Sequence, residues 1–545
     1  MASIYDVGSS ALTSMQRAIA TTGHNIANVN TEGYSRQEVH FGTRNPERVG
    51  LVEIGTGVEV TSIRRAHDRF LIGDVQMRSS SSAYYQLHAQ TAQNIDGLLA
   101  DPSTGIAPAI DKFFAAMEAV AANPNSAPER RVMLSEAQML AQRFNYVDER
   151  LSDYAQELNT RMSNMTDDIN ALASEIAQLN QTIATFGGQS GDMPNDLLDK
   201  RDQAITDLSR IIKVQTTTQD DGSINVSIGR GQRLVIGHNA EQLRIDFPAA
   251  QDGPARLYLS VPSGAESEVT AQLTGGELGG ALEAGTQMIN NARRDIGLLA
   301  AGIASTFNAQ HASGDDLNGE PGEAFFSPLD ITVTGTRTNS GQSNVTATIT
   351  DVGQLTGEGY SIRYEGDGIR LTNLSTGATE LVPEGVLELE GLQLELPPAS
   401  PEINGDTFFI EPTLGAAGQL SVSLTDISKI AAANRDGAVG DNRNMLSLIA
   451  LRDANVLKSG AHSYSSLYGS TLSGVAVETR SALSNAETEM ALLQSAEGRL
   501  EGLRGVNLDE EATNLIRYQQ AYQAAAQVIS VANDIFDTLL MAARR

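Results

Sequence analysis

The sequence contains no cysteine in 545 residues. This absence excludes disulfide bonds, thiolate metal sites and cysteine nucleophiles, and it leaves the redox environment of the protein undetermined. Basic residues are also scarce, because 38 lysines and arginines stand against 67 aspartates and glutamates and give a formal net charge of −29. A net charge of this sign argues against a nucleic-acid partner, whose phosphate backbone is itself negative.

Long apolar runs are missing as well. No stretch approaches the ~20 residues that a membrane-spanning helix requires, and the N-terminus lacks a basic region followed by an apolar core. We therefore expect no membrane insertion, and we expect any export to use a route without a cleaved signal of that type. Neither H-E-x-x-H nor G-x-S-x-G occurs, so these two catalytic motifs are unavailable and we predict no enzyme.

The last forty residues carry a helical pattern with two apolar stripes. The first stripe advances by alternate steps of three and four residues, the spacing of a helix that packs along another helix. The second stripe lies one residue earlier at each step, so the apolar face is too broad for one partner and predicts several. The first stripe contains Ala512, Leu515, Gln519, Tyr522, Ala526, Ile529, Asn533, Phe536 and Leu540, and the second contains Tyr518, Ala521, Ala525, Val528, Ala532, Ile535 and Leu539. Asn507 and Glu510 are typical of an N-cap with its reciprocal carboxylate.

A matching pattern begins the chain and ends in turn-forming residues between Asn28 and Gly33. Its positions again step by three and four: Tyr5, Gly8, Leu12, Met15, Ile19, Thr22, Ile26 and Val29. Two such helices at opposite ends of a long chain predict that the termini meet as one discontinuous unit, from which the middle of the chain loops outward.

Between the two ends, the pattern predicts an elongated α+β protein of several domains, with terminal coiled-coil helices, a long helical-bundle body and an inserted all-β domain. Apolar residues recur at helical spacing from Phe144 to Phe186, which predicts a rod of roughly 60 Å. We assign residues 1–40 and 505–545 to the terminal unit, 41–327 and 413–504 to a mainly helical body with a β-rich excursion at 213–273, and 328–412 to the insertion. Helices are expected to resume near Ile427.

Three weaker signals have plainer interpretations. The acidic loop with Asp315, Asp316, Asn318, Glu320 and Glu323 is rich in oxygen ligands, but its spacing departs from the calcium-loop pattern, so we predict a surface turn and no metal site. The run Gly229–Arg233, GRGQR, follows a strand but opens no helix, and predicts a hairpin turn in place of a phosphate cradle. Met162 and Met165 fall on the apolar side of the rod and predict packing, and no cofactor is expected.

Two terminal motifs resemble those of the flagellar axial proteins. They are NIANVNTEGYSRQ at 25–37, with Asn25, Asn28, Gly33 and Tyr34, and GVNLDEEATNLIRYQQAYQAAAQVI at 505–529. Internal stretches, PNDLLDKRDQ at 194–203, GGELGG at 275–280, FNAQH at 307–311 and GDNRN at 440–444, are similar to the hook-associated protein 1 family, which joins hook to filament. The resemblance is colinear and weakest in 328–412. His24 departs from the usual pattern, and we assign it no role.

The resemblance implies a structural subunit of the extracellular flagellum that leaves the cell unfolded by flagellar type III export. It implies a ring of copies next to the hook protein, followed by hook-associated protein 3 and then flagellin, and a chaperone that holds the C-terminal helix before secretion. The apolar residues of both terminal stripes are then the assembly residues, and we expect both helices to be mobile in the free monomer. Another axial protein (hook-associated protein 3, hook protein or flagellin) and an adhesin-like module on a helical stalk remain alternatives.

Overall fold

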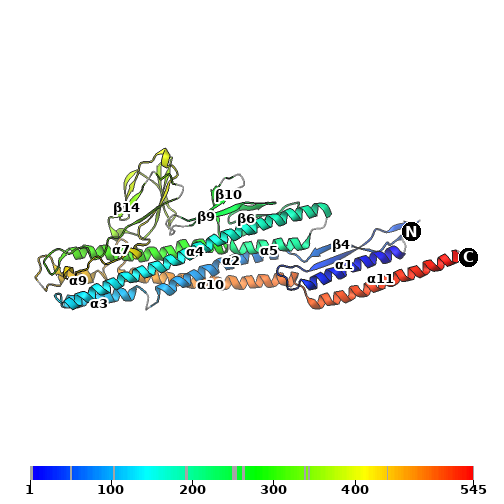
Figure 1. Ribbon diagram of the computed structural model, residues 1–545, viewed down its shortest axis with the longest axis horizontal. Coiled ribbons are helices and arrows are strands. Elements are labelled where there is room, and N and C mark those ends of the chain that lie inside the picture. Colours follow the sequence, from blue (N-terminus) through cyan, green and yellow to red (C-terminus); the bar gives the residue numbers. More distant parts are fainter. Residues whose placement is uncertain are drawn as a thin grey trace.

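The molecule is elongated, and both ends of the chain lie together at one end of it (Figure 1). The computed structural model describes residues 4–49, 52–101, 105–190, 194–247, 255–260, 264, 266–336, 339–341, 344–366, 368–438 and 440–543. Long helices run along the molecule, and small antiparallel sheets lie on one side of them. This α+β mixture agrees with the predicted fold class.

The helix α4 is the longest element of the body. It spans Ala127–Ser190, 64 residues or about 96 Å at 1.5 Å per residue. Most of the residues that predicted it are buried from Phe144 to Ile183, including Met162 and Met165, whereas Tyr154, Leu172 and Leu179 are half-buried. Phe186 beyond them is 49% exposed. The periodic side chains therefore form one continuous contact with the rest of the body. The other body helices are α2 (Arg69–Leu99), α3 (Ala107–Ala122), α5 (Asn195–Ile211), α6 (Gly276–Glu283), α7 (Asn290–Ala312), α8 (Ala416–Gln419), α9 (Arg443–Ala450) and α10 (Tyr464–Arg504), with a π-helical segment, η2, at Ala284–Ile289 between α6 and α7.

The β-rich excursion lies against α4 (Figure 1). Asparagines on α4 bind its strands: the Asn180 amide donates to the carbonyls of Ile224 and Gly237 at 2.8 and 2.7 Å, and Asn170 exchanges two hydrogen bonds of 2.8 Å with Leu243. One sheet has the order β5 (Val214–Thr218), β6 (Ile224–Ile228), β7 (Gln232–Ile236), β8 (Asn239–Ala240); the other has β11 (Glu266–Glu268), β10 (Arg256–Ser260), β9 (Gln242–Asp246). The predicted turn is confirmed, since Gly229 and Gly231 have φ of 56° and 110° in the β6–β7 hairpin.

A second group of strands projects from the body (Figure 1). Its larger sheet has the order β13 (Thr332–Gly335), β20 (Thr407–Glu411), β15 (Tyr360–Glu365), β16 (Gly368–Asn373), β17 (Thr379–Val382), and its smaller sheet β14 (Thr346–Ile349), β19 (Leu392–Leu396), β18 (Gly385–Leu389). A buried ion pair connects it to the body, because Arg294 of α7 donates to Glu411 at 2.9 and 2.7 Å. The division of the chain into three units stays a prediction.

Two expectations need comment. Helices do not resume at Ile427, because a single 3₁₀ turn covers Ile427–Lys429 and regular helix returns only at Arg443. The intervening chain instead bonds to neighbours, as where β21 (Ala433–Asn434) pairs with β12 (Gly314–Asp315). In the acidic loop Asp316 accepts from the backbone of Asn318 and Glu320 at 2.7 and 3.0 Å, which forms a turn. Within the described residues no group of three potential ligands could hold a metal ion.

The terminal helices are α1 (Ile4–Ala27) and α11 (Leu508–Ala543), and two hairpins lie between α1 and α2. The strand β1 (Gln37–Thr43) pairs with β4 (Val58–Arg65), and β2 (Glu47–Val49) pairs with β3 (Val52–Ile54). Figure 1 shows α1 and α11 side by side at the end of the molecule farthest from α3 and α9. No helix in the described ranges has both the length and the apolar character needed to cross a membrane.

Candidate functional site

The two terminal helices contact each other through small residues. On α11 the buried side chains include Ala525 and Ala532 of the second stripe, at 7% and 2% exposure. On α1, Gly8 is buried, and a Cβ atom at this glycine would lie 2.7 Å from Cγ1 of Ile529. The hydroxyl of Tyr5 donates to Oδ1 of Asn533 at 2.7 Å. Because glycine and alanine allow close approach, α1 packs against Ala525 and Ala532 of the second stripe and also contacts Ile529 and Asn533 of the first.

Ala525 and Ala532 of the second stripe are therefore buried within the single chain. Much of the first stripe is open instead: Tyr522, Phe536 and Leu540 are 39%, 55% and 44% exposed, and Ala526 is exposed too. Two members of the second stripe, Val528 and Ile535, join this surface at 39% and 51%. The sequence did not show which residues of α11 face α1, because both stripes are apolar. The contact depends on small residues of α1 such as Gly8.

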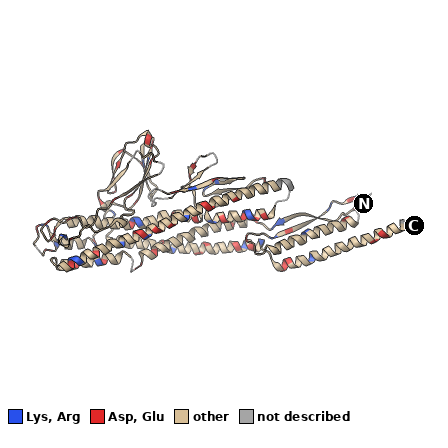
Figure 2. Ribbon diagram, viewed as in Figure 1, with Lys and Arg blue, Asp and Glu red and all other residues tan. Residues whose placement is uncertain are grey.

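The open apolar surface of α11 is nearly free of charge. No charged residue occurs between Tyr518 and Asn533, and Figure 2 shows the corresponding part of α11 as uncharged. Leu539 and Met541 extend the surface toward the C-terminus, at 63% and 69% exposure. A continuous apolar surface of this kind on a protein of net charge −29 marks a site of protein contact. The predicted residues of α1, Leu12, Met15, Ile19, Ile26 and, just after the helix, Val29, are all half-buried.

The N-terminal motif folds around Asn25, whose side chain is almost completely buried. Its amide donates to the carbonyl of Gln37 at 3.0 Å, and its Oδ1 accepts from the Gln37 backbone at 2.9 Å and from the Tyr34 hydroxyl at 2.7 Å. One asparagine thus joins the end of α1 to the start of β1. Burial, assisted by the charges of Asp196, Asp199 and Glu511, raises the pKa of Tyr34, so its hydroxyl stays protonated and donates.

The turn of the motif rests on α5. Gly33 has φ of 78°, and a Cβ atom there would lie 2.8 Å from the Gln203 amide oxygen, so glycine suits both the conformation and the space. The Ser35 backbone donates to Asp199 at 3.0 Å, and Gln37 donates to Asp196 at 2.8 Å. The two motifs at 25–37 and 194–203, distant in sequence, are therefore parts of one joint.

Ion pairs complete this joint. Nη1 of Arg65 lies 2.7 Å from both Asp199 and Asp202, and these side chains are largely shielded from solvent. Arg36 binds Glu510 at the start of α11 at 2.9 Å, and its backbone N–H donates to the carbonyl of Arg504 at the end of α10. The joint therefore attaches α1 to the body through the segment that follows it, and attaches α11 through the segment that precedes it.

Sequence reasoning missed several residues of the joint. Arg65 belongs to none of the quoted motifs, and Asp199 and Asp202 lie in PNDLLDKRDQ but were given no individual role. His24, whose Nε2 lies 3.3 Å from Asp196, was assigned none. Asn28 and Thr31 bond to each other within the turn. Asn507 caps α11 as predicted, accepting from Asp509 at 2.9 Å, but Glu510 points to Arg36. The sequence signal for the joint is limited to the charged residues in and near the motifs GYSRQ and PNDLLDKRDQ. The residues that pair are more than 130 positions apart in the sequence.

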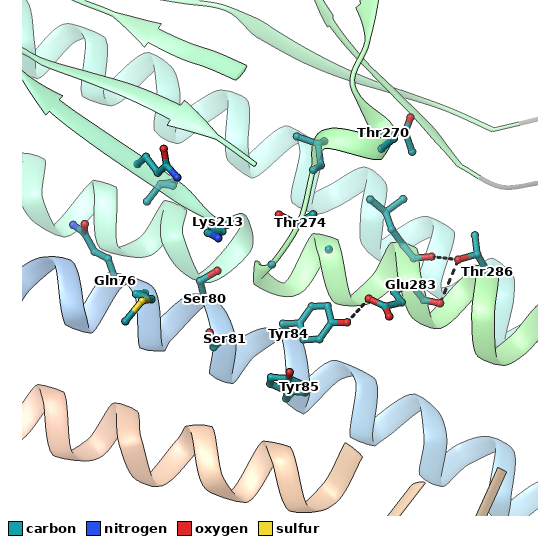
Figure 3. A pocket seen from close by; sticks show the side chains of 18 of the residues that line it. Gln76, Ser80, Ser81, Tyr84, Tyr85, Lys213, Thr270, Thr274, Glu283 and Thr286 are labelled. Carbon is teal, nitrogen blue, oxygen red and sulfur yellow. Dashed lines mark hydrogen bonds between the residues drawn. The ribbon is translucent and has the colours of Figure 1, made fainter. Parts of the chain in front are cut away.

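A cavity of about 1170 Å³ lies elsewhere in the body, between α2, α6 and the start of β5. Figure 3 shows Tyr84 directed at Glu283, to which its hydroxyl donates, and Thr286 directed at the helix backbone, where it bonds to the carbonyls of Leu282 and Glu283. These polar groups bond to one another. Lys213 lies on the opposite wall. The cavity presents no nucleophile with an adjacent base.

Comparisons with known proteins agree with this geometry. The model of the flagellar hook-associated protein FlgK helical domain matches residues 92–326. The models of the flagella basal body rod protein and of the FlgEFG rod protein C-terminal region match 6–34 and 496–541, which include most of α1 and most of α11. The FlgK hook junction protein of Burkholderia pseudomallei has the same fold, with a TM-score of 0.70, 21% identity, and coverage of 79% of this chain and 99% of that one.

Curated relatives match along the whole chain. Flagellar hook-associated protein 1 of Escherichia coli is 30% identical over 99% of this chain and 100% of its own length. The Salmonella typhimurium protein of the same name is 30% identical with the same coverage, and that of Bacillus subtilis is 25% identical over 97% of this chain and 96% of its own. The chain therefore belongs to the flagellar hook-associated protein 1 family.

Proposed function

We propose that this chain is a structural subunit that connects the flagellar hook to the filament and that polymerises through its terminal helices. As a member of its family it is a component of the flagellum, outside the cell. The observation that carries the proposal is the open apolar surface of α11, which lies at the tip of an elongated molecule where neighbouring copies can reach it. The role is architectural, and we propose no catalytic activity.

The partners follow from this arrangement. A second copy covers the open surface of α11 in a ring, with the hook protein on one side and hook-associated protein 3 on the other. Before assembly the same surface requires protection, since an exposed apolar helix promotes aggregation. A flagellar export chaperone that binds α11 supplies it, and the chain leaves the cell unfolded by flagellar type III export.

A double substitution on the open surface tests the proposal. In cells carrying Phe536→Ser with Leu540→Ser in place of the normal gene, we expect hooks without filaments and flagellin in the medium. Each lost side chain removes about 1.5 to 3 kcal/mol of burial in the assembly, so incorporation should fall at least tenfold. The stability of the purified monomer should change by less than about 0.5 kcal/mol, because both side chains are exposed.

The matched control is Gln527→Ser, an exposed polar position on the same helix, which should support normal swimming. Secreted but unassembled protein would locate the defect in assembly, whereas protein retained in the cell would locate it in chaperone binding or export. Normal filaments on cells with the double substitution would contradict the proposal.

A further inference from the structure

A positively charged cleft lies beside the joint, in a protein whose net charge is strongly negative. It has a volume of about 910 Å³ and opens between β4, α2, α5 and the start of the β5–β6 hairpin. Four arginines line it: Arg64, Arg65, Arg69 and Arg201.

Only part of this positive charge is neutralised. Arg65 is paired with Asp199 and Asp202, as described above. Arg64 and Arg69 are exposed, and neither forms an ion pair within the described part of the chain. Arg201 is 3% exposed and donates through Nη1 to the Asn180 side chain and the Gly222 carbonyl, which are neutral acceptors, while its buried Nε has no hydrogen-bond partner. Four arginines against two aspartates leave the cleft positive.

The neighbouring groups respond to this charge. Burial lowers the pKa of Arg201 to about 10, with Arg65 and Arg69 acting in the same direction against Asp202. Burial also lowers the pKa of His67 at the rim, and Arg65 and Arg69 again contribute. The cleft therefore favours a negative group and disfavours a further positive one.

The cleft continues along α2. Gly73 and Gln76 border both the cleft and the cavity of Figure 3, where Lys213 adds another positive charge. Met77 on the same stretch is 52% exposed. The cleft and the cavity are therefore neighbours along α2, and the four arginines line the cleft.

Exposed carboxylates lie on α10 at the same level. Ala496 and Leu500 of α10 pack on Val75 of α2, and Arg499 binds Asp74 at 2.5 Å, which places this part of α10 beside the start of α2. Glu497 and Glu501 lie one turn apart on α10, and both are exposed. Glu501 pairs with Arg504 at 3.2 Å, whereas Glu497 forms no ion pair within the described ranges. Figure 1 shows α5, which forms the cleft, and α10 on different sides of α2.

We propose that the basic cleft receives Glu497 of a second copy of this chain. The contact is head-to-tail: the cleft side of one copy meets the α10 side of the next, which generates a ring or a helical array when repeated. It lies in the body, separate from the terminal helices, and it sets the lateral spacing and orientation of neighbours by charge. This inference rests on the proposed assembly of the chain in the flagellum.

Cysteine crosslinking tests the contact without background, because the chain has no cysteine of its own. Cells produce two versions of the protein together, one with Arg69→Cys and one with Glu497→Cys, and isolated hook–filament structures are treated with a mild oxidant. We expect a disulfide-linked dimer on a non-reducing gel. Replacement of Glu497→Cys by Val477→Cys, which is 71% exposed and farther along α10, should give none.

Charge reversal provides an independent measurement. Arg69→Glu and Glu497→Arg should each reduce the number of filaments several-fold, and a chain carrying both changes should recover most of that loss. If the protein is present in hook–filament structures but neither the disulfide nor the rescue is observed, the inference is overturned and the proposed function is left intact. Absence of the protein from these structures in otherwise normal flagella would overturn both.

Discussion

Asn25 is the residue on which the N-terminal motif depends. Its replacement by alanine removes three hydrogen bonds and leaves the Tyr34 hydroxyl and both backbone groups of Gln37 without partners in a buried site. We expect a loss of about 2 to 4 kcal/mol in the stability of the joint. Urea unfolding and protease sensitivity of the first 40 residues measure it. Asn30→Ala, at an exposed position of the same motif, should change stability by less than about 0.5 kcal/mol.

His311 links stability to pH. It is fully buried, its Nδ1–H donates to the Glu323 carbonyl at 2.7 Å, and its Nε2 accepts from the Ala431 backbone at 2.9 Å, so the neutral ring is fixed in one tautomer. Burial lowers its pKa, so below about pH 6.5 the unfolded chain binds a proton that the folded chain does not. The contribution is complete above that pH and is lost as the pH falls, with a slope of up to about 1.4 kcal/mol per pH unit.

Unfolding of His311→Leu at pH 7.5 and pH 5.5 checks this prediction. The variant should be less stable at pH 7.5, because Ala431 and Glu323 lose their partner, but its stability should decline less on acidification. His238→Leu, at an exposed position, should keep the pH dependence of the unchanged protein. An equal decline in both variants would contradict the assignment.

Among the elements, α1 and α11 show what periodicity predicts and what it leaves open. Both helices and their pairing followed from the spacing of apolar residues, as did α4 from Phe144 onward. The spacing did not predict which side of α11 faces α1, because the two adjacent apolar stripes differ by a rotation of only about 100°. The side that makes the contact depends on Gly8 of α1 and on the alanines of α11. The joint could not be predicted from the sequence either, because Arg65 and Asp199 come together only after the chain has folded.

Substitution of Gly8 tests the close contact of these two helices. Gly8→Val places atoms where the Ile529 side chain now lies, so we expect α1 to separate from α11 at a cost of about 1 to 3 kcal/mol. Hydrogen exchange of residues 4–27 and 508–543 should accelerate together. Gly23→Ala is the matched control in the same helix: no atom lies within 4 Å of its added Cβ, and the change should leave exchange unaltered or slower. Unchanged exchange in Gly8→Val would show that the pair does not depend on close packing.

The terminal unit and the body also differ in the kind of surface that they expose. The terminal helix α11 presents an uncharged apolar surface, whereas the basic cleft and Glu497 of α10 lie on the body. Apolar burial supplies most of the free energy of association, and charge selects orientation. Two contacts of different physical character along one long molecule would therefore define both the strength and the geometry of its packing in an array.

At the scale of the whole molecule, we expect the projecting strands to be a separate unit whose removal leaves the body folded. Thr332 and Glu411 are paired across β13 and β20, so their Cα atoms lie about 5 Å apart and a short glycine link can replace residues 333–410. Glu411 is retained because Arg294 of α7 would otherwise lose its partner at a cost of about 3 to 5 kcal/mol. We expect the shortened chain to unfold cooperatively, with a lower urea m-value in proportion to the surface removed, and to enter hook–filament structures. A shortened chain that aggregates despite the retained Arg294–Glu411 pair would instead show that these strands complete the core of the body.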